Sequence, residues 1–205
     1  DYSDKPLNRG KVLSAEDLTR LGGFARYKDV DGDGIGYRTL PGTDHPMAAY
    51  FTRGSGHNEK AQYTERPDDY FNNMERLSKK FETARSLVPR PEVVRTGQSK
   101  IGLIAFGTSD FATRESLVQL DKEYGLGVDY LRLRAYPFSR EAHEFVASHE
   151  RVYVIEQNRD AQMLSLLKLD LQAEEVVKLR SILHFNGLPI DARSITDDLV
   201  TQEGI

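Results

Sequence analysis

Carboxylates at alternating positions mark one short stretch of the chain. Asp29, Asp31 and Asp33 are separated by single residues, and a glycine follows each of the last two. Calcium loops gather hard oxygen ligands in this way, and carboxylates without thiolates or paired imidazoles favour calcium or magnesium over zinc or copper. Leu40 occupies the twelfth position, where an EF-hand needs a bidentate glutamate. The string therefore predicts either a calcium or magnesium site or a solvated turn whose aspartates bond their own backbone.

A glycine-flanked cation lies further along the chain. Arg53, Ser55 and His57 alternate with Gly54 and Gly56. Glycine permits backbone angles that other residues resist, and an arginine can bind a carboxylate through two parallel hydrogen bonds. We predict a loop that moves over an anionic substrate, with Arg53, Ser55 and His57 as its substrate-facing residues. The alternative is an ordinary surface loop that carries a salt-bridged arginine.

A third polar group directly follows an apolar run. Glu156, Gln157, Asn158 and Arg159 come after the predicted strand 152–155. Ligands and partners of open α/β sheets gather beyond the carboxyl ends of the strands, so these four residues are predicted to contact another subunit. The alternative is helix capping, with Asp160 satisfying the first amides of the next helix.

The elements that hold these groups differ between the two parts of the chain. Residues 1–90 are predicted to be mostly loop with two helices. The first helix begins at Ser14, where Asp17 completes a capping-box spacing, and ends at Gly22. The second helix ends at Pro89, and its apolar residues recur at steps of three and four, which predicts a core-facing stripe. This stripe consists of Tyr70, Met74, Leu77, Phe81, Ala84 and Val88.

From about Pro91 onward, apolar strands alternate with amphipathic helices. Strands are predicted at 101–106, 128–133, 152–155 and 179–183, with helices between them and a last helix after Asp191. Right-handed crossovers between such strands build a mainly parallel sheet with helices on both faces. The sequence therefore predicts a three-layer αβα domain over residues 91–205.

Composition excludes several classes of protein and site. None of the 205 residues is cysteine, so the chain offers no ligands for an iron–sulfur cluster, no thiolate nucleophile and no disulfide. The net charge of −4 gives no broad field to attract a phosphate backbone, so nucleic acid is not an expected partner. No apolar run approaches the roughly 20 residues that a bilayer requires.

The start of the chain is also informative. Asp1 is not an initiator methionine and no signal-like apolar segment follows it, so we read the chain as a fragment of a longer protein. The absence of cysteine is compatible with the cytoplasm, which is the predicted location, although many exported proteins also lack disulfides.

Four long strings resemble a known family. They are RYKDVDGDGIGYRTLPGTDHP from Arg26, YFTRGSGHNE from Tyr50, DYLRLRAYPF from Asp129 and RVYVIEQNRDAQM from Arg151. In this order they resemble the C-terminal part of the alpha subunit of 2-oxoacid:ferredoxin oxidoreductases, and most closely the 2-oxoglutarate type. The resemblance covers essentially the whole chain.

The resemblance implies a fold and a division into domains. Residues 91–205 would be similar to the C-terminal domain of transketolase, with Val93 and Val94 pairing antiparallel to strand 101–106 through a turn at Gly97. Residues 1–90 would be the tail of a pyrimidine-side domain and its connection. The rest of the alpha subunit and a beta subunit would complete a larger oligomer.

The resemblance also implies an activity for the full enzyme. Such an enzyme uses thiamine diphosphate with magnesium and an iron–sulfur cluster to convert 2-oxoglutarate and coenzyme A to succinyl-CoA and CO2, and it passes electrons to ferredoxin. The segment in hand would serve assembly and substrate-loop roles and be inactive alone. Two alternatives are the same reaction with pyruvate or a branched-chain 2-oxoacid, and a non-catalytic metal- or ligand-binding module.

Overall fold

The computed structural model describes residues 6–52, 54–97 and 99–205. The chain forms two compact units, Asp1–Ala84 and Arg85–Ile205, which we call unit 1 and unit 2. The division falls inside helix α2 (Pro67–Leu87), a few residues before the predicted boundary at Pro91. Among the described residues, no helix combines the length and apolar character that a membrane crossing demands.

Unit 1 consists of loops around helix α1 (Ala15–Leu21) and most of helix α2. The predicted capping box is confirmed, because the Ser14 hydroxyl accepts from the amide of Asp17 and the Asp17 carboxylate accepts from the amide of Ser14. Gly22 ends the helix with φ +68°, the left-handed angle that glycine adopts without strain. Leu18 is fully buried with Leu13 and Ala48 in the small core of this unit.

The prediction that the stripe on α2 forms a core is wrong for the described part of the chain. No residue of α2 is buried, and the side chains of Tyr70 and Met74 are 63% and 38% exposed. The loops of unit 1 contact α2 through polar bonds instead: Arg76 donates to the carbonyl of Gly34, and the hydroxyl of Thr83 donates to the carbonyl of Asp33. Helical periodicity identified the apolar face but not what covers it.

Unit 2 contains a five-stranded sheet with the strand order β1-β3-β2-β4-β5. Strands β3, β2, β4 and β5 are parallel to their neighbours, and β1 is antiparallel. The predicted mainly parallel α/β sheet is therefore confirmed. The strands are β1 (Glu92–Val94), β2 (Ile101–Phe106), β3 (Asp129–Leu133), β4 (Arg151–Glu156) and β5 (Leu179–Leu183).

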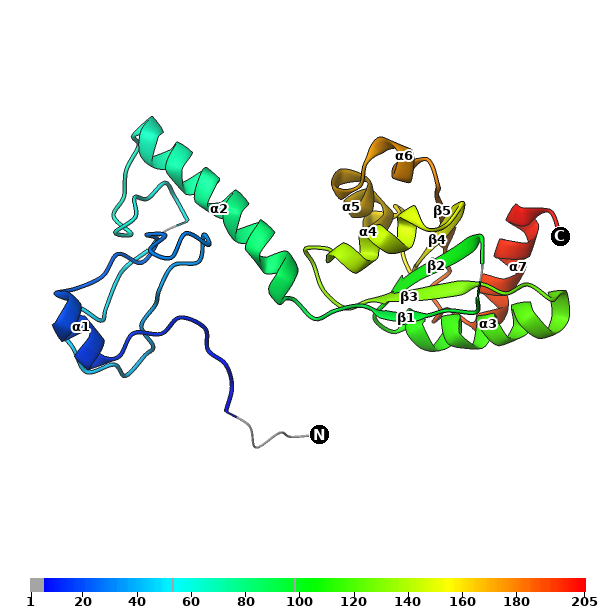
Figure 1. Cartoon of the computed structure of the whole chain (residues 1–205), viewed down its shortest axis with the longest axis horizontal. Coiled ribbons are helices and arrows are strands. Elements are labelled where there is room, and N and C mark those ends of the chain that lie inside the picture. The colour runs from blue at the N-terminus through cyan, green and yellow to red at the C-terminus, as the bar shows by residue number, and fades with distance from the viewer. Residues whose placement is uncertain (1–5, 53, 98) are drawn as a thin grey trace. The chain divides into compact units, whose positions relative to one another are not determined.

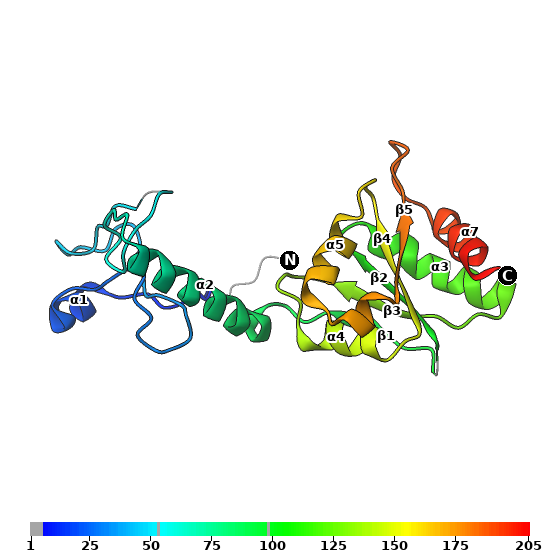
Figure 2. The same cartoon turned by 90° about the horizontal axis from the view of Figure 1, so that it is seen from above.

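Helices cover both faces of this sheet, as Figures 1 and 2 show. Helices α3 (Ser109–Tyr124) and α7 (Ala192–Glu203) pack on one face around a core that includes Leu103, Tyr130 and Ile195. On the other face, α4 (Arg140–Ala147) and α5 (Gln162–Asp170) enclose Ile104, Phe145 and Leu167. The short helix α6 (Ala173–Val176), which the sequence analysis did not predict, precedes β5.

The predicted partner of the first strand is wrong, although its orientation is right. Val93 and Val94 pair antiparallel with β3, opposite Leu131 and Tyr130, and not with β2. The reason lies just after β1, where Thr96 donates its amide and its hydroxyl to the Asp129 carboxylate at the start of β3. These bonds hold the chain that leaves β1 against β3 and leave β2 to pair on the far side of β3.

The last turn of α2 is bound within unit 2 by an ion pair. Both terminal nitrogens of Arg85 contact the carboxylate of Asp170, at 2.7 and 2.5 Å, and His143 Nε2 lies 3.0 Å from the same carboxylate. Arg85 also donates to the carbonyl of Phe138. Arg85 is therefore a structural residue of unit 2 even though it lies before the predicted boundary.

We expect Arg85→Ala and Asp170→Ala each to lower the free energy of unfolding of unit 2. The coupling energy between the two substitutions should be about 1–3 kcal/mol, because a bidentate, partly buried ion pair is stronger than a surface pair. Urea unfolding of both single variants and the double variant measures this coupling. Additive single effects would show that the pair adds nothing beyond its two side chains.

Candidate functional site

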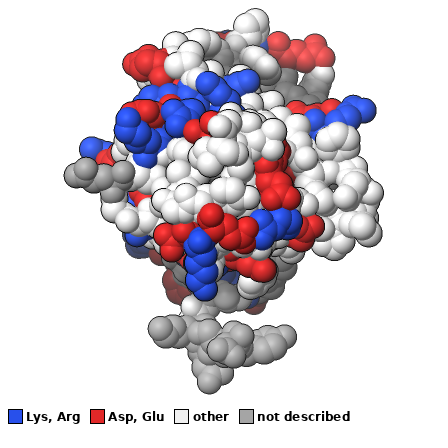
Figure 3. All heavy atoms as spheres, turned by 90° about the vertical axis from the view of Figure 1, so that its right-hand side faces the viewer, with Lys and Arg blue, Asp and Glu red and all other residues white. Residues whose placement is uncertain are grey.

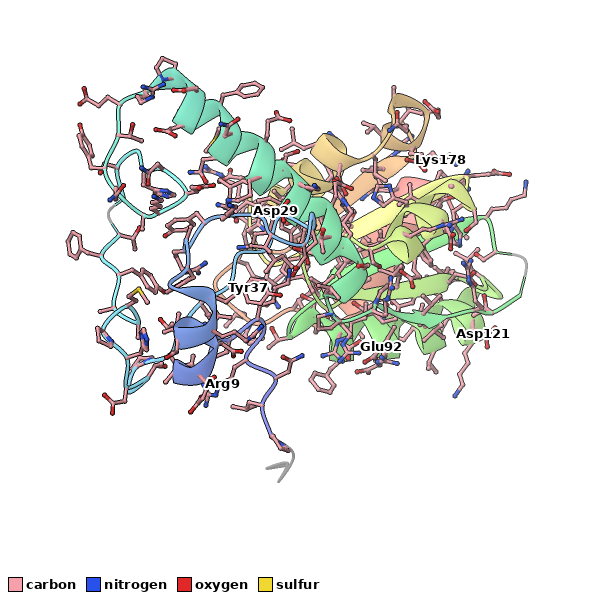
Figure 4. The ribbon with its side chains drawn as sticks, turned by 60° about the vertical axis from the view of Figure 1, so that its left-hand side comes forward. Arg9, Asp29, Tyr37, Glu92, Asp121 and Lys178 are labelled. Carbon is pink, nitrogen blue, oxygen red and sulfur yellow. The ribbon has the colours of Figure 1, made fainter. Side chains whose placement is uncertain are left out.

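The acidic string of unit 1 forms ion pairs with two lysines from distant parts of the chain. Lys11 Nζ lies 2.6 Å from Asp31 and 2.7 Å from Asp33, and Lys79 Nζ lies 3.3 Å from Asp29. Figure 4 shows Asp29 beside helix α2, which carries Lys79. The hydrogen bond from Lys11 is the main cause that lowers the pKa of Asp33. Two ammonium groups thus stand where a bound cation was predicted.

The three aspartates do not converge on one point. Within residues 6–52, 54–97 and 99–205, no group of three His, Cys, Asp or Glu side chains is arranged to hold a metal ion. The geometry therefore gives no support to a calcium or magnesium site at Asp29, Asp31 and Asp33. Asp33 also accepts from the amide of Ile35, as the alternative of a self-bonded turn expects.

The glycines of the string have a packing role that the metal interpretation missed. Gly34 has φ +78°, and a β-carbon at this position would lie 2.4 Å from the amide nitrogen of Lys80 and 2.7 Å from the carbonyl oxygen of Arg76. Both atoms belong to the backbone of α2. The loop can approach the helix this closely only because residue 34 has no side chain.

His57 lies where three cavities of unit 1 meet. These cavities have volumes of about 530, 610 and 670 Å³, and His57 lines all three. Its ring stacks on Tyr27, with ring centroids 4.0 Å apart and planes 23° from parallel. Ser55 lines the third cavity together with Gly54 and Gly56. Two of the three predicted substrate-loop residues, Ser55 and His57, therefore face the same cavity.

The third predicted loop residue, Arg53, lies outside the described residues. Two cations lie beside the tyrosine on which His57 stacks: the guanidinium carbons of Arg26 and Arg76 are 5.1 and 5.4 Å from the centre of the Tyr27 ring. Arg26 and Tyr27 belong to one of the strings that carry the resemblance, whereas Arg76 gave no local signal because it comes from α2. The loop segment and two arginines thus surround one tyrosine.

The polar group after β4 divides into a capping part and a surface part. The fully buried carboxylate of Glu156 accepts from the amides of Met163 and Leu164, at 2.7 and 2.9 Å, and so caps helix α5. Asn158 accepts from the amides of Asp160 and Gln162. Capping is thus performed by Glu156 and Asn158 and not by Asp160, whose carboxylate pairs with Arg159.

Gln157 connects two of the loops at the carboxyl edge of the sheet. Its side chain donates to the hydroxyls of Thr108 and Ser109 and accepts from the amide of Ile190. Gln157 and Arg159 are the exposed members of the group, and the side chain of Arg159 is 74% exposed. A subunit contact at this edge remains a prediction, and Arg159 is the residue best placed to make it.

Charge is finely mixed over unit 2. Figure 3 shows basic and acidic side chains side by side on the face that it presents. At the edge of the sheet, Glu92 is within 4 Å of three arginines, Arg114, Arg132 and Arg134. This pattern suits paired charges at a protein surface better than a continuous basic track for nucleic acid.

Comparison with solved structures identifies a relative in fold. The chain aligns with a 2-oxoglutarate:ferredoxin oxidoreductase from Magnetococcus marinus, solved with 2-oxoglutarate, coenzyme A and succinyl-CoA bound, with a TM-score of 0.73 and 22% identity. The alignment covers 88% of this chain and 31% of that one, so this chain spans about a third of that protein's length. No protein-family model and no curated protein sequence matches the chain.

Two further structures align less well. The alpha chain of a probable 2-oxoacid ferredoxin oxidoreductase from Thermoplasma acidophilum aligns with a TM-score of 0.37 and 20% identity, over 57% of this chain and 98% of that one. A split-gene transketolase aligns with a TM-score of 0.44 and 16% identity, over 55% of this chain and 40% of that one. The alignment with the Magnetococcus enzyme confirms, at the level of the fold, the resemblance predicted from the four strings.

Proposed function

We propose that the chain is part of the alpha subunit of a thiamine-diphosphate-dependent 2-oxoacid:ferredoxin oxidoreductase, of the type that acts on 2-oxoglutarate. The observation that carries the proposal is the alignment with the Magnetococcus enzyme, because it includes most of both units and not only the common α/β sheet. The strings that begin at Arg26, Tyr50, Asp129 and Arg151 support the same assignment independently of the fold.

The proposal assigns the cofactors to other parts of the enzyme. With no cysteine in the sequence, the iron–sulfur cluster needs ligands from another chain or segment. In the described part of this chain, no three His, Cys, Asp or Glu side chains are grouped to hold a metal ion, so the proposal places the magnesium that accompanies the diphosphate elsewhere in the enzyme. Residues 1–90 then act as the tail of the pyrimidine-side domain and residues 91–205 as an assembly domain, in a cytoplasmic enzyme whose partners are the beta subunit, ferredoxin and coenzyme A.

The loop that contains Arg53, Ser55 and His57 is the part of this chain proposed to approach the active site. Gly54 has open space around it and permits backbone angles that other residues resist, whereas Gly56 packs against the backbone of Thr64. Cavities of several hundred cubic ångströms lie along Ser55 and His57. An arginine on such a loop can bind the second carboxylate of 2-oxoglutarate, which pyruvate lacks.

We expect Arg53→Ala in the full enzyme to lower kcat/KM for 2-oxoglutarate about tenfold or more, equivalent to at least ~1.4 kcal/mol, while Tm and cluster content stay constant. The assay is coenzyme-A-dependent reduction of ferredoxin with 2-oxoglutarate, pyruvate and a branched-chain 2-oxoacid in parallel. Arg20→Ala, on an exposed ion pair of α1, is the matched control.

The three substrates also distinguish the alternatives. Preference of the wild-type enzyme for pyruvate or a branched-chain acid would move the assignment to another type within the same family. A complex that reduces ferredoxin with none of the three would contradict the proposed function. Wild-type kinetics in Arg53→Ala would leave the function standing but return Arg53 to an ordinary surface role.

A further inference from the structure

The loop between β5 and α7 carries an asparagine that can react with its own backbone. Asn186 is followed by Gly187, and this is the only asparagine–glycine pair in the sequence. Both residues are exposed, and Figure 2 shows that the loop projects beyond the end of β5. The side-chain carbonyl of an asparagine and the next backbone nitrogen can close a five-membered ring. Because the reacting atoms belong to adjacent residues, they meet without the entropy loss of an encounter between two molecules.

Gly187 supplies the attacking nitrogen of this ring closure. Its φ is +88°, an angle that glycine adopts without strain, and a β-carbon at this position would meet no atom within 4 Å. Every other residue type carries a β-carbon next to its backbone nitrogen. Glycine is therefore the following residue that crowds the ring closure least.

The side chain of Asn186 is held at one end only. Its Oδ1 accepts from the amide of Leu188 at 2.9 Å, as asparagines in turns commonly do. When a nucleophile attacks Cγ, negative charge develops on this same oxygen, so the Leu188 amide stabilises the tetrahedral intermediate as an oxyanion donor does. In the part of the chain that the structure describes, no group binds the side-chain nitrogen of Asn186, which is the leaving group.

Asn58 is an asparagine of the same chain without these features. Its Oδ1 accepts from the amides of Lys60 and Gln62, and its side-chain nitrogen donates to the side chain of Gln62. The next residue is Glu59, which carries a β-carbon. Both ends of the Asn58 side chain are thus bound and its ring closure is more crowded, so it should react more slowly than Asn186.

We propose that Asn186 is a site of spontaneous deamidation. The backbone nitrogen of Gly187 gives its proton to solvent and forms a bond to Cγ of Asn186. The Cγ–Nδ2 bond breaks, and the side-chain nitrogen takes up a proton and leaves as ammonia. Water then opens the succinimide ring: addition at Cγ gives aspartate, and addition at the main-chain carbonyl carbon gives isoaspartate. The reaction consumes only water, so the proposal does not depend on the proposed enzymatic function.

The modification changes the charge of the loop. Aspartate and isoaspartate both carry a carboxylate at neutral pH, whereas the asparagine amide is neutral. The new charge lies between Phe185 and Leu188, which are 61% and 70% exposed. The loop is bonded to Gln157 through the amide of Ile190, so it belongs to the same edge of the sheet. Deamidation therefore adds a negative charge where a subunit contact is predicted.

The test is tryptic peptide mapping of the folded 205-residue chain after incubation at neutral and at alkaline pH. Peptide 181–193 contains Asn186 as its only side-chain amide, and peptide 54–60 contains Asn58 as its only one. We expect peptide 181–193 to yield two separable products of equal mass, the aspartate and isoaspartate forms. It should react at least ~tenfold faster than peptide 54–60, equivalent to at least ~1.4 kcal/mol in the barrier. Alkaline pH should speed the reaction, because the attacking amide must lose its proton.

Two variants locate the reacting pair. Asn186→Gln would have to close a six-membered ring, and Gly187→Ala places a methyl group beside the attacking nitrogen. Each should slow the loss of ammonia at least ~tenfold. Phe185→Leu, in the same loop but outside the reacting pair, should react as the wild type does. If alanine at residue 187 distorts the loop, Asn186→Gln and the comparison of the two wild-type peptides decide the question.

Four results would contradict the proposal. An unchanged mass of peptide 181–193 would show that the folded loop keeps the reacting atoms apart. Equal rates in the two peptides would remove the role of the glycine and of the free leaving group. A folded chain that reacts at least ~tenfold more slowly than the same chain in urea would show that the loop protects Asn186. Aspartate without isoaspartate would indicate direct hydrolysis of the side chain instead of ring closure.

Discussion

Gly34→Ala is expected to lower the free energy of unfolding of unit 1 by about 2–5 kcal/mol. Two costs add. The left-handed backbone at φ +78° costs an L-residue roughly 1–2 kcal/mol. A methyl group would also collide with the backbone of Lys80 and Arg76, atoms that cannot turn away as a side chain can, and overpacking of this kind costs about 1–3 kcal/mol.

The neighbouring glycine provides a matched control. Gly32 has the same φ of +78°, but a β-carbon there would meet only the end of the Lys79 side chain, at 3.8 Å. Gly32→Ala should therefore carry the backbone cost alone. The difference in unfolding free energy between the two variants, measured by urea titration of the chain, isolates the contact with α2. Equal losses in both variants would show that the loop does not pack on the helix as described.

This comparison also separates packing from metal binding at the acidic string. Because Lys11 and Lys79 pair with the aspartates, the stability of wild-type unit 1 depends on loop-to-helix contact and on these ion pairs. None of this is visible locally in the sequence. Lys11 and Lys79 are far from the string along the chain, so the spacing of the aspartates does not reveal the lysines that the fold brings to them.

Elements whose residues bond and pack locally are predictable from the sequence. Strands 101–106 and 179–183 have the predicted bounds. The first of them, IGLIAF, is buried between helices on both faces and therefore reads as a continuous apolar run. The cap at Ser14 and the last helix after Asp191 follow from side chains that bond amides two or three residues away, which makes their signals local.

Strand pairing and the makeup of the candidate site depend on residues that are distant in the chain, and local sequence patterns do not predict them. A strand of three residues such as β1 carries too few side chains to specify its neighbour, and the bonds from Thr96 to Asp129 decide it. At the candidate site, His57 was found through its glycine-rich loop. Arg76 was not, because a single arginine on an exposed helix looks the same whether or not a cavity lies beside it.

The second large effect is expected at Asp129, where Asp129→Asn should destabilise unit 2 by about 3 kcal/mol at neutral pH. The residue is 1% exposed, and its carboxylate accepts four hydrogen bonds. Oδ1 receives the amide and hydroxyl of Thr96 at 2.8 and 3.0 Å, and Oδ2 faces Arg95 at 2.9 Å and His149 at 3.3 Å. An asparagine would present an NH2 group to donors on one side, and breaking a buried charged pair costs about 3–5 kcal/mol when neither partner can reach water. Arg95 is half exposed and can turn to solvent, which places the expected loss at the low end of that range.

The loss should depend on pH in a defined direction. Burial alone would raise the pKa of Asp129, but the hydrogen bonds from Thr96, Arg95 and His149 outweigh it, and the net pKa is lowered. A carboxyl group whose pKa is lower in the folded state contributes stability that is fully present above its unfolded pKa of about 3.9 and is lost as the pH falls through the folded value. The difference in unfolding free energy between wild type and Asp129→Asn should therefore be constant from about pH 5 to 7 and shrink below about pH 4.

Asp121→Asn, at an exposed carboxylate on α3 that is labelled in Figure 4, should change stability by less than ~0.5 kcal/mol at every pH. A pH-independent loss in Asp129→Asn would mean that the side chain acts through its shape and not through its charge.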